Sequence, residues 1–492
     1  MKKGARRIIL FVAVALVVIV VAAMAVVKAV YLDKLRPQIE AAASEATGLD
    51  VTVDEMGLAV LPSLAVAAKR IRVKGEKSEI LSVSEVDISV ALGPLLSRRV
   101  EVSHVRVVGP VINIVRDKNG KYNFEGKRAP AKKAEKKGGG PSPLAAVLAR
   151  EISVVDGRMT YLDEASGSKT SMLGFDVEVR DVSIKGLSGA REARELAKSI
   201  GFRGTLNVKT FEAGNYKVSD VSSEYVWENG VLDVEPMKLS LYGGGAEGRC
   251  VIDLRGKKPR VEVDQNVKGL DLGRMVRDTT GRDVLSGKAD LSAKLSMAGA
   301  SATEVKRSLD GTVSLRGADL SLKGADIDAS LAKLEETQKF NLFDVGSFFV
   351  LGPLGPLLTK GTEYAGIATE GVKRGEESLI TKYVLDWKID NGIAAARDVA
   401  FATRKNRIAF QGRLDIAAER FDDLTGAVLT PKGCAKYTQT IVGPFNKPRV
   451  KAEGVVKGLV KPLSSLLGKA KDIVGSGQCK PFYTGSVEHP AP

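Results

Sequence analysis

Residues 100–114 read VEVSHVRVVGPVINI, and this stretch decides the fold class. Apolar residues alternate with polar ones at 100–102, at 105–107 and again at 112–114. Side chains of a β-strand point alternately to opposite faces, so this pattern places one face against apolar material and the other in water. The same pattern recurs at 51–53 and 86–90, and turn residues such as DKNG at 117–120 separate the runs. The sequence therefore predicts a mainly β protein.

Upstream of these strands lies a short predicted helix. Pro37 suits a first-turn position, residues 38–47 are rich in Ala and Glu, and Gly48 suits a left-handed stop.

A continuous apolar run begins at Ile8 and ends at Val27. Its twenty residues would span ~30 Å as a helix, which is the thickness of the bilayer's hydrocarbon core. Four basic residues precede it, so the N-terminus is expected in the cytoplasm and the body is exported. The alternative is a signal peptide cleaved after Ala25, but the run is longer than a typical signal core and Lys28 closes it. Both interpretations export the body.

The segment GKRAPAKKAEKKGGGPSP at 126–143 has a different composition. It holds six Lys or Arg and no apolar residue larger than Ala apart from its prolines, which is typical of a flexible basic linker. We expect a domain boundary there.

Beyond the linker, two hairpin units resemble each other. One begins at VWENGV (226–231) and the other at WKIDNGI (387–393), which indicates a sheet that grows by repeated hairpins. Residues 311–324 predict a further hairpin. Residues 327–338 and 459–474 predict amphipathic helices, and the apolar stretch FFVLGPLGPLL (348–358) predicts a kinked loop packed on the sheet or touching lipid.

The three cysteines suit an exported chain. Cys434 and Cys479 lie in a Gly- and Pro-rich stretch and are predicted to form a disulfide, whose closure of the loop would contribute roughly 4 kcal/mol. Cys250 fits a buried strand position. We therefore predict five segments: tip and anchor at 1–33, a β-domain at 34–125, the linker at 126–143, a β-body at 144–430 and a disulfide-stapled cap at 431–492.

Composition and motifs argue against catalysis. His104 and His489 are the only histidines, and no hydrolase, zinc or nucleotide motif occurs, so we expect no enzyme, no cofactor and no metal. The net charge of +15 favours anionic partners, and in an exported chain lipid phosphates suit this better than nucleic acid. Solvated outer strand faces account for many of these charges. Aromatics at 5% disfavour a carbohydrate platform.

A sheet of this size must cover its apolar face. It can close as a sandwich, take helices or curl into a trough that holds apolar ligands. The helices are too few for the second solution, and patterning leaves the other two open.

Several stretches resemble the AsmA family. They are LRPQIE at 35–40, SEATGLDVTV at 44–53, LGPLLSRRVEV at 92–102, VGPVINIVRD at 108–117 and GKYNF at 120–124. The order of these pieces, from anchor to helix end, turn and strand, also matches. Looser likenesses occur at 241–245, 389–392 and 442–448.

This resemblance implies an inner-membrane-anchored periplasmic protein that supports outer-membrane homeostasis. It implies an elongated, curled antiparallel β-sheet, or β-groove, for phospholipid or another envelope lipid. The inward apolar residues would then face lipid: Val51, Val53, Val86, Ile88, Val90, Val100, Val102, Val105, Val107, Ile112 and Ile114.

Size distinguishes this chain from long bridge-like lipid-transfer proteins. Roughly 20–25 strands at ~4.8 Å each would extend at most ~100–120 Å, so a bridge between two membranes would need an outer-membrane or periplasmic partner protein. The alternative function is a non-transporting scaffold or assembly factor for outer-membrane components, built on a closed sandwich.

Overall fold

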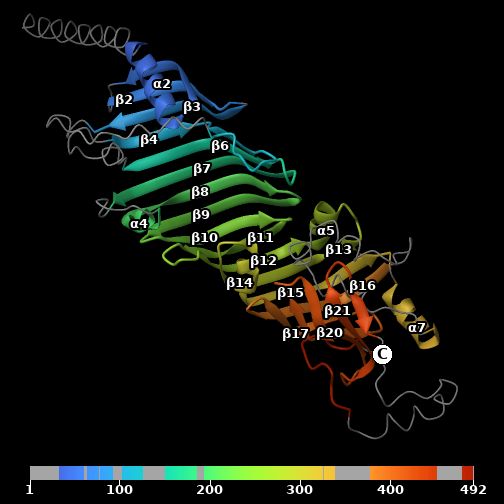
Figure 1. Ribbon diagram of the computed structural model, residues 1–492. Coiled ribbons are helices and arrows are strands. Elements are labelled where there is room, and N and C mark those ends of the chain that lie inside the picture. Colours follow the sequence, from blue (N-terminus) through green and yellow to red (C-terminus); the bar gives the residue numbers. More distant parts are fainter. Residues whose placement is uncertain are drawn as a thin grey trace, which may run out of the picture. The chain divides into compact units, whose positions relative to one another are not determined.

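The computed structural model describes residues 33–59, 64–76, 78–91, 102–125, 150–184, 193–324, 326–337, 377–451 and 479–490. Within these ranges lie 22 strands and a few short helices, which confirms the prediction of a mainly β chain (Figure 1). The chain divides into two compact units. Unit 1 comprises Met1–Gly214 and Ser219–Glu228, and unit 2 comprises Asn215–Val218 and Asn229–Pro492.

Several predictions fall outside the described residues. They are the anchor from Ile8 to Val27, the candidate Val100, the linker at 126–143, the loop at 348–358 and the helix at 459–474. Within the described ranges, no helix has the length and apolarity to cross a membrane.

Unit 1 is a twisted sheet flanked by two helices. Its elements are α2 (Asp33–Thr47), β1 (Asp50–Ala59), β2 (Leu64–Lys74), β3 (Glu79–Val90), β4 (Val102–Val108), β5 (Val111–Arg116), β6 (Glu151–Asp163), β7 (Ser168–Ile184), α4 (Ala193–Ser199), β8 (Ile200–Ala213) and β9 (Tyr216–Glu228). Strands β1, β2 and β3 pair in order, and β6, β7 and β8 pair in order. Between these groups β4 and β5 share one position, because each pairs with β3 on one side and β6 on the other.

The pairing of β6 corrects one prediction. Strands β4 and β5 run parallel to β6, so the expectation of an entirely antiparallel sheet is wrong at this position. A parallel neighbour cannot be reached by a tight hairpin and needs a long crossover connection. Residues 126–143 belong to that connection, and the strands on either side of it pair with each other. The domain boundary expected at 126–143 stays a prediction.

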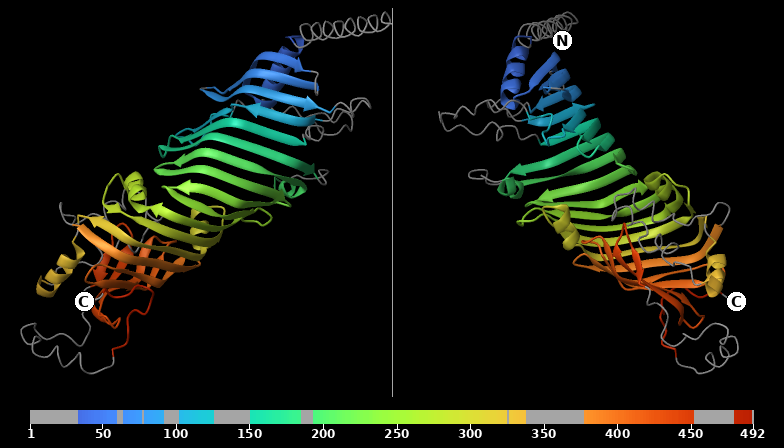
Figure 2. Two further views of the ribbon diagram at one scale, coloured as in Figure 1. Left: turned by 180° about the vertical axis from the view of Figure 1, so that it is seen from behind. Right: turned by 45° about the vertical axis from the view of Figure 1, so that its right-hand side comes forward.

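Helix α2 contacts the edge strand β1, in blue in Figures 1 and 2. The predicted stop is confirmed, since Gly48 has a φ of 70° and its N–H donates to Ser44 O at 2.8 Å. Pro37 lies inside the helix, not in a first turn of a helix at 38–47. At the edge of the sheet, the N–H of Val51 donates to Ser44 Oγ at 3.0 Å. The side chains of α2 therefore bond the outer edge of β1.

Unit 2 is antiparallel in every pairing that its described strands make. Its elements are β10 (Val231–Leu241), β11 (Gly244–Asp253), β12 (Arg260–Asp271), α5 (Leu272–Thr280), β13 (Leu285–Ser286), β14 (Lys288–Ala298), α6 (Ala302–Arg307), β15 (Asp310–Lys323), α7 (Ile327–Thr337), β16 (Glu377–Asp390), β17 (Ile393–Ala402), β18 (Arg407–Gln411), β19 (Arg413–Asp415), β20 (Arg420–Leu429), β21 (Ala435–Pro444) and β22 (Arg449–Lys451). Neighbours follow chain order, with β13 and β14 sharing one position and β18 and β19 another.

Turn chemistry explains the hairpins of unit 2. Asn391 and Gly392 join β16 to β17 with φ values of 49° and 78°, and positive φ at both positions is what a two-residue type I′ turn requires. The hairpin predicted at 311–324 is wrong, because these residues form the single strand β15. At its centre Gly317 leaves room for Tyr383 of the next strand, since a Cβ there would lie 2.3 Å from the Tyr383 hydroxyl. This glycine is required by packing and does not mark a turn.

The main core of the chain lies in unit 2. Fully buried side chains such as Leu270, Leu320, Phe421 and Ile441 belong to one apolar cluster that extends from β10 to residue 445. The strands that supply its C-terminal part are orange and red in Figure 2. The predicted helix at 327–338 is confirmed as α7, whose Ile327 and Leu331 enter this cluster.

Residues 482–487 cover the opposite face of β16, β17, β18 and β20. Tyr483 and Val487 pack there on a small cluster that includes Ala400, Ala409 and Leu429. We call residues 479–490 the C-terminal strap. A disulfide joins Cys479 of the strap to Cys434, with Cα atoms 6.2 Å apart.

Candidate functional site: the apolar face of unit 1

Apolar side chains of unit 1 form rows that run across the strands. The first row follows the pairing register through seven positions: Val51, Val73, Leu81, Ile112, Met159, Met172 and Phe211. A second row contains Met56, Ala68, Val86, Val107, Val154, Val177 and Leu206. A third contains Val66, Ile88, Val105, Ile152 and Val179. We call these rows, with the Val53 and Phe175 positions between the first two, the apolar face of unit 1.

Along one line across the strands, the apolar residues of the rows change between odd-numbered and even-numbered positions. In β1 they are odd-numbered up to Val53 and even-numbered from Met56, and in β6 they change from even to odd numbers along the chain. Left-handed backbone lies on this line at Arg70, Gly109, Asp156 and Gly174, with φ values of 50°, 59°, 51° and 60°. A residue whose backbone leaves the β region interrupts strict alternation, so the side chains beyond it change faces. The rows therefore stay apolar on both sides of the line.

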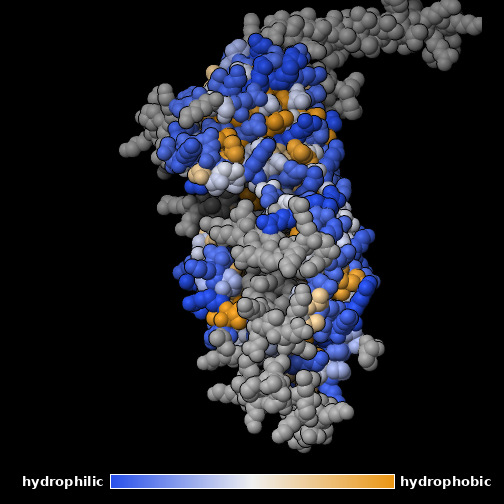
Figure 3. Space-filling view, turned by 90° about the vertical axis from the view of Figure 1, so that its right-hand side faces the viewer, coloured by the Kyte–Doolittle hydropathy of each residue, from blue (hydrophilic) through white to orange (hydrophobic). Residues whose placement is uncertain are grey.

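These rows are incompletely covered. In the described part of unit 1, the aliphatic and aromatic side chains with less than a tenth of their surface exposed are Val53, Ile80, Val83, Val102, Phe175 and Val208. Most other row members are partly exposed, and Ile88 and Phe211 each keep 37% of their surface exposed. Figure 3 shows hydrophobic residues in its upper half, flanked by hydrophilic ones. The face therefore offers aliphatic surface to solvent between charged margins.

The structure brings the sequence candidates together on this face. Val51, Val86, Ile88, Val105, Val107 and Ile112 are members of the rows, and Val53 lies between the first two. Ile114 pairs with Tyr161 beside the first row, and Val90 pairs with Val102 at the end of β3. That these side chains contact lipid stays a prediction.

Sequence reasoning missed the members from β6, β7 and β8. Met159, Met172 and Phe211 extend the first row, yet the parallel pairing that aligns them with Ile112 leaves no local signal. The only local signal was the alternation of apolar and polar residues within 157–163 and 168–184, the ranges that contain Met159 and Met172.

An aromatic cluster forms the end of this face near α4. The Phe202 and Trp227 rings stack at 5.8 Å, and Tyr225 meets Phe202 edge-on at 6.1 Å. Gly204 makes this possible, because a Cβ there would lie 2.7 Å from the Tyr225 hydroxyl. The polar atoms of the rings are satisfied locally: Trp227 Nε1 donates to Ala197 O at 2.9 Å and the Tyr225 hydroxyl donates to Glu178 O at 2.8 Å. Aromatic rings with a bonded polar tip suit a boundary between apolar and polar surroundings.

One contact brings a nucleophile to a histidine. His104 Nε2 lies 3.2 Å from Ser153 Oγ, and His104 Nδ1 lies 3.5 Å from Glu151 Oε2. Serine hydrolases place their three groups in this order. Here the residues belong to a polar row in which Ser89, His104, Glu151, Arg180 and Arg203 pair in register. We interpret them as part of the charged surface of the sheet. The other histidine, His489, is partly buried, with Nδ1 2.8 Å from Pro490 O.

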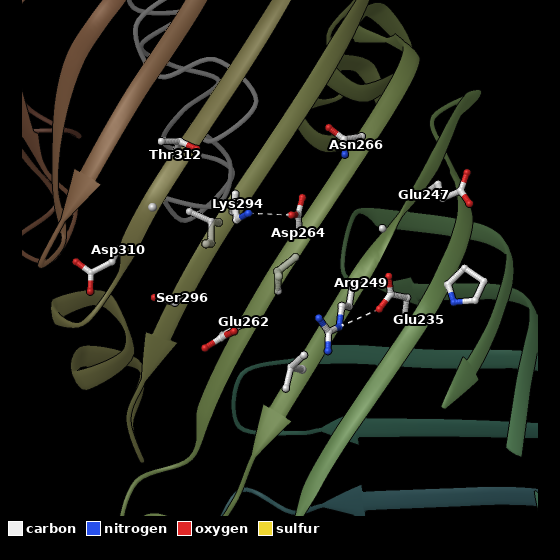
Figure 4. A pocket seen from close by; sticks show the side chains of 16 residues that line it. Glu235, Glu247, Arg249, Glu262, Asp264, Asn266, Lys294, Ser296, Asp310 and Thr312 are labelled. Atoms are coloured by element: carbon white, nitrogen blue, oxygen red, sulfur yellow. Dashed lines mark ion pairs between the residues drawn. The ribbon is translucent and has the colours of Figure 1, made fainter. Parts of the chain in front are cut away.

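Unit 2 carries a polar concavity of about 880 Å³, shown in Figure 4. Arg249 Nε lies 2.8 Å from Asp233 Oδ1 and 3.1 Å from Glu235. Lys294 lies 3.4 Å from Asp264. The hydrogen bond from Arg249 holds the pKa of Asp233 below its usual range, and the same pair raises the pKa of Arg249. Carboxylates outnumber cations in the lining, and both cations are paired with carboxylates, so we interpret the concavity as part of the charged face of the sheet.

Cys250 lies in β11 in register with Val263, and it is partly buried where full burial was expected. Burial raises the pKa of its thiol, so this cysteine is less reactive than an exposed one. Groups of three or more metal-ligating side chains do not occur among the residues that the structure describes.

The comparisons with known proteins give one positive result. Curated proteins and solved structures each return no significant match. The family model of the AsmA family matches residues 1–198 and 191–398, which together are most of the sequence and include the whole apolar face of unit 1. The chain therefore belongs to the AsmA family.

Proposed function

We propose that this chain is a lipid-handling protein of the cell envelope that binds or transfers phospholipid acyl chains on the apolar face of unit 1. The observation that carries the proposal is the first apolar row, from Val51 to Phe211. It crosses seven strand positions with aliphatic, sulfur-containing and aromatic side chains that solvent still reaches.

Energetics favour an apolar occupant for this face. Each Å² of apolar surface removed from water contributes about 25 cal/mol, and large contiguous apolar patches are uncommon on monomers that have no ligand or partner. The row spans six gaps between strands, or ~29 Å at ~4.8 Å each, which is close to the ~30 Å of hydrocarbon in a bilayer. Two acyl chains laid end to end would cover it.

Topology supports an envelope role. The apolar run from Ile8 to Val27, with basic residues before it, would anchor the chain in the inner membrane, and the body would then lie in the periplasm. Helix α2 follows the run at Asp33 and contacts β1, so the anchor would hold the β1 end of unit 1 close to the membrane. The role would be binding and transfer without catalysis, in support of the outer membrane.

The alternative function, a non-transporting scaffold, is supported by unit 2, because the apolar cluster of unit 2 is closed, as it would be in a dry sandwich. A scaffold would not need the exposed apolar rows of unit 1, whereas lipid handling accounts for them.

A photo-crosslinking experiment in intact cells tests the proposal. Benzoyl-phenylalanine is placed at Met172, in the first row, and at the adjacent Ser171 as the control, which points to the other face of β7. Lipid adducts at position 172 and none at 171 are expected. Protein adducts alone at both positions, or no adducts at either, would contradict lipid handling.

A matched pair of substitutions extends the test. Met159→Asp puts a charge into the first row, whereas Thr160→Asp puts the same charge on the other face of β6. Lipid that co-purifies with the full-length chain should be lost with Met159→Asp and retained with Thr160→Asp. Equal retention in both variants would place the lipid elsewhere.

A further inference from the structure

We propose that the lipid site of this protein is blind-ended, in the sense that acyl chains bind the apolar face of unit 1 and do not enter the β13–β21 part of unit 2. We call that closed part of unit 2 the stopper. This inference rests on the proposed function and states where lipid stops. It makes the chain a holder that takes up and releases lipid through the same open face, and not a conduit through its whole length.

The stopper has a core without an open apolar row. Tyr383, Phe401, Phe410, Phe421 and Phe445 each keep less than 2% of their surface exposed. Phe421 and Phe445 meet edge-on with ring centroids 4.9 Å apart. Because these rings are buried against one another, an acyl chain could enter only if the rings moved apart.

Helix α5 closes one margin of this core. Leu272 is fully buried, and Met275 and Val276 keep 7% and 4% of their surface exposed within the same cluster. The helix is capped at both ends: Asp271 Oδ1 accepts from the N–H of Arg274 at 2.9 Å, and Gly281 ends the helix with a φ of 73°. Both caps hold a short helix in place on the core.

Helix α7 covers another part of this core. The N–H of Ile327 donates to Ser378 Oγ of β16 at 2.7 Å, and Ile327 is 1% exposed. The bond fixes the first turn of α7 to the sheet at a buried point.

The far face of the stopper is covered as well. Arg407 keeps 7% of its surface exposed and donates to Val487 O and Thr430 O, each at 3.1 Å. Asp398 accepts hydrogen bonds from the Tyr483 hydroxyl and from Ser486. The C-terminal strap therefore stays on this face, and both faces of β16–β20 lack exposed apolar rows.

The chain carries a reporter in each region. Its two tryptophans are Trp227, which stacks on Phe202 at the aromatic end of the apolar face, and Trp387, which is 3% exposed inside the stopper core. Bromine atoms on an acyl chain quench tryptophan fluorescence on contact. The blind-end proposal therefore predicts opposite behaviour for the two residues.

The experiment uses the full-length chain in vesicles of phosphatidylcholine with brominated acyl chains. The variant Trp387→Phe leaves Trp227 as the reporter, and Trp227→Phe leaves Trp387. We expect the loss of most Trp227 emission relative to vesicles of unbrominated lipid, and no change in Trp387 emission.

A second measurement needs no substitution. The wild-type chain is exposed to phosphatidylcholine that carries a diazirine on its acyl chain, and the adducts are mapped by mass spectrometry. Adducts are expected on residues 151–184 and 200–213 and not on residues 377–429.

Every other outcome contradicts either the blind-end proposal or the proposed function. Quenching of Trp387, or adducts on residues 377–429, would overturn the blind end and leave lipid handling intact. Bound lipid that neither quenches Trp227 nor labels unit 1 would also overturn it. A chain that binds no lipid in any assay would overturn the proposed function itself.

Discussion

Glu40 Oε1 of α2 accepts a hydrogen bond from the backbone N–H of Val53, at 2.7 Å. Val53 lies in the edge strand β1, whose outer N–H groups would otherwise be free to pair with another strand. Ser44 accepts from Val51 in the same way, and Arg36 donates to Asp54 O at 2.9 Å. Exposed edge strands are sites of unwanted pairing, and coverage by a helix is one of the ways in which proteins prevent it.

Removal of the Glu40 carboxylate should loosen this edge. In Glu40→Ala the Val53 N–H loses a charge-assisted partner, and we expect the free energy of unfolding to fall by about 1–2 kcal/mol. Amide hydrogen exchange at Val53 should accelerate, and Glu40→Gln, which keeps an acceptor oxygen, should show a smaller change. Unaltered exchange at Val53 in the Ala variant would show that α2 does not protect the edge.

Gly157 provides the space in which the Phe175 ring lies. A Cβ at this position would be 2.3 Å from the ring, so Gly157→Ala should destabilise unit 1 by about 1–3 kcal/mol through overpacking. Phe175→Leu should relieve part of this, so that the double variant loses less than the sum of the single losses. Denaturant unfolding measures all three, and strict additivity would contradict the contact.

Arg407 fixes the C-terminal strap. In Arg407→Met the Val487 carbonyl loses the Arg407 donor and the Thr430 carbonyl keeps only the Gly433 N–H, so we expect a loss of about 2–3 kcal/mol. Arg404 lies in the turn that precedes β18 and is exposed, so Arg404→Met should change stability by no more than about 0.5 kcal/mol. Equal effects of the two substitutions would rule out a specific role for Arg407.

The disulfide should hold the strap against local opening. Cys479→Ser removes a link across 45 residues, which the chain-entropy model values at up to about 4 kcal/mol. We expect faster amide exchange at Tyr483 and Val487 in this variant, while amides of β6 and β7 in unit 1 keep their protection. Unchanged exchange in the strap would mean that its hydrogen bonds suffice without the disulfide.

The buried hydroxyl of Tyr383 should make the fold less stable at alkaline pH. Burial raises the pKa of its hydroxyl, which donates to Lys288 O at 2.9 Å. A group whose pKa is raised by folding stabilises the fold below its unfolded pKa, about 10 for tyrosine, and loses that contribution as the pH rises above it. Wild-type stability should therefore fall above about pH 10, and Tyr383→Phe should fall less steeply. At pH 7 the Phe variant should be about 1–2 kcal/mol less stable, because the Lys288 carbonyl loses its donor. Urea unfolding of the wild type and of Tyr383→Phe, at pH 7 and above about pH 10, tests this.

Much of the fold followed from alternation, since period-two runs at Val51, Ile88 and Ile112 became strands β1, β3 and β5. The Ala- and Glu-rich stretch before Gly48 became α2, and residues 327–338 gave α7. Each of these signals lies within a few consecutive residues, where local patterning is most informative.

The features that sequence reasoning missed depend on distant contacts. Nothing near Val105 indicates that β6 will pair with β4 in parallel, after a connection of more than forty residues. Gly317 resembled a turn residue because a glycine needed for close packing against Tyr383 cannot be told from one needed for a bend. Asp156 and Arg70 gave no sign of left-handed backbone, which a non-glycine residue adopts only under tertiary constraint.

Only part of the candidate site could be predicted, because its remaining members depend on distant contacts. Alternation identified Val51, Val86 and Ile112, but the rows exist only once the strand register is known. The triplet of His104, Ser153 and Glu151 likewise arises from a pairing across residues almost fifty apart in the chain.

The bonding of β1 by α2 limits how such a sheet can lengthen during evolution or by design. New strands cannot be added outside β1, so at this end of the sheet they must be inserted between existing ones. A hairpin inserted between β7 and β8 would preserve the direction of every later strand and extend each row by ~10 Å. A single inserted strand would reverse all of them. The length of the apolar surface is therefore adjustable in steps of two strands, while the end formed by α2 and β1 stays constant.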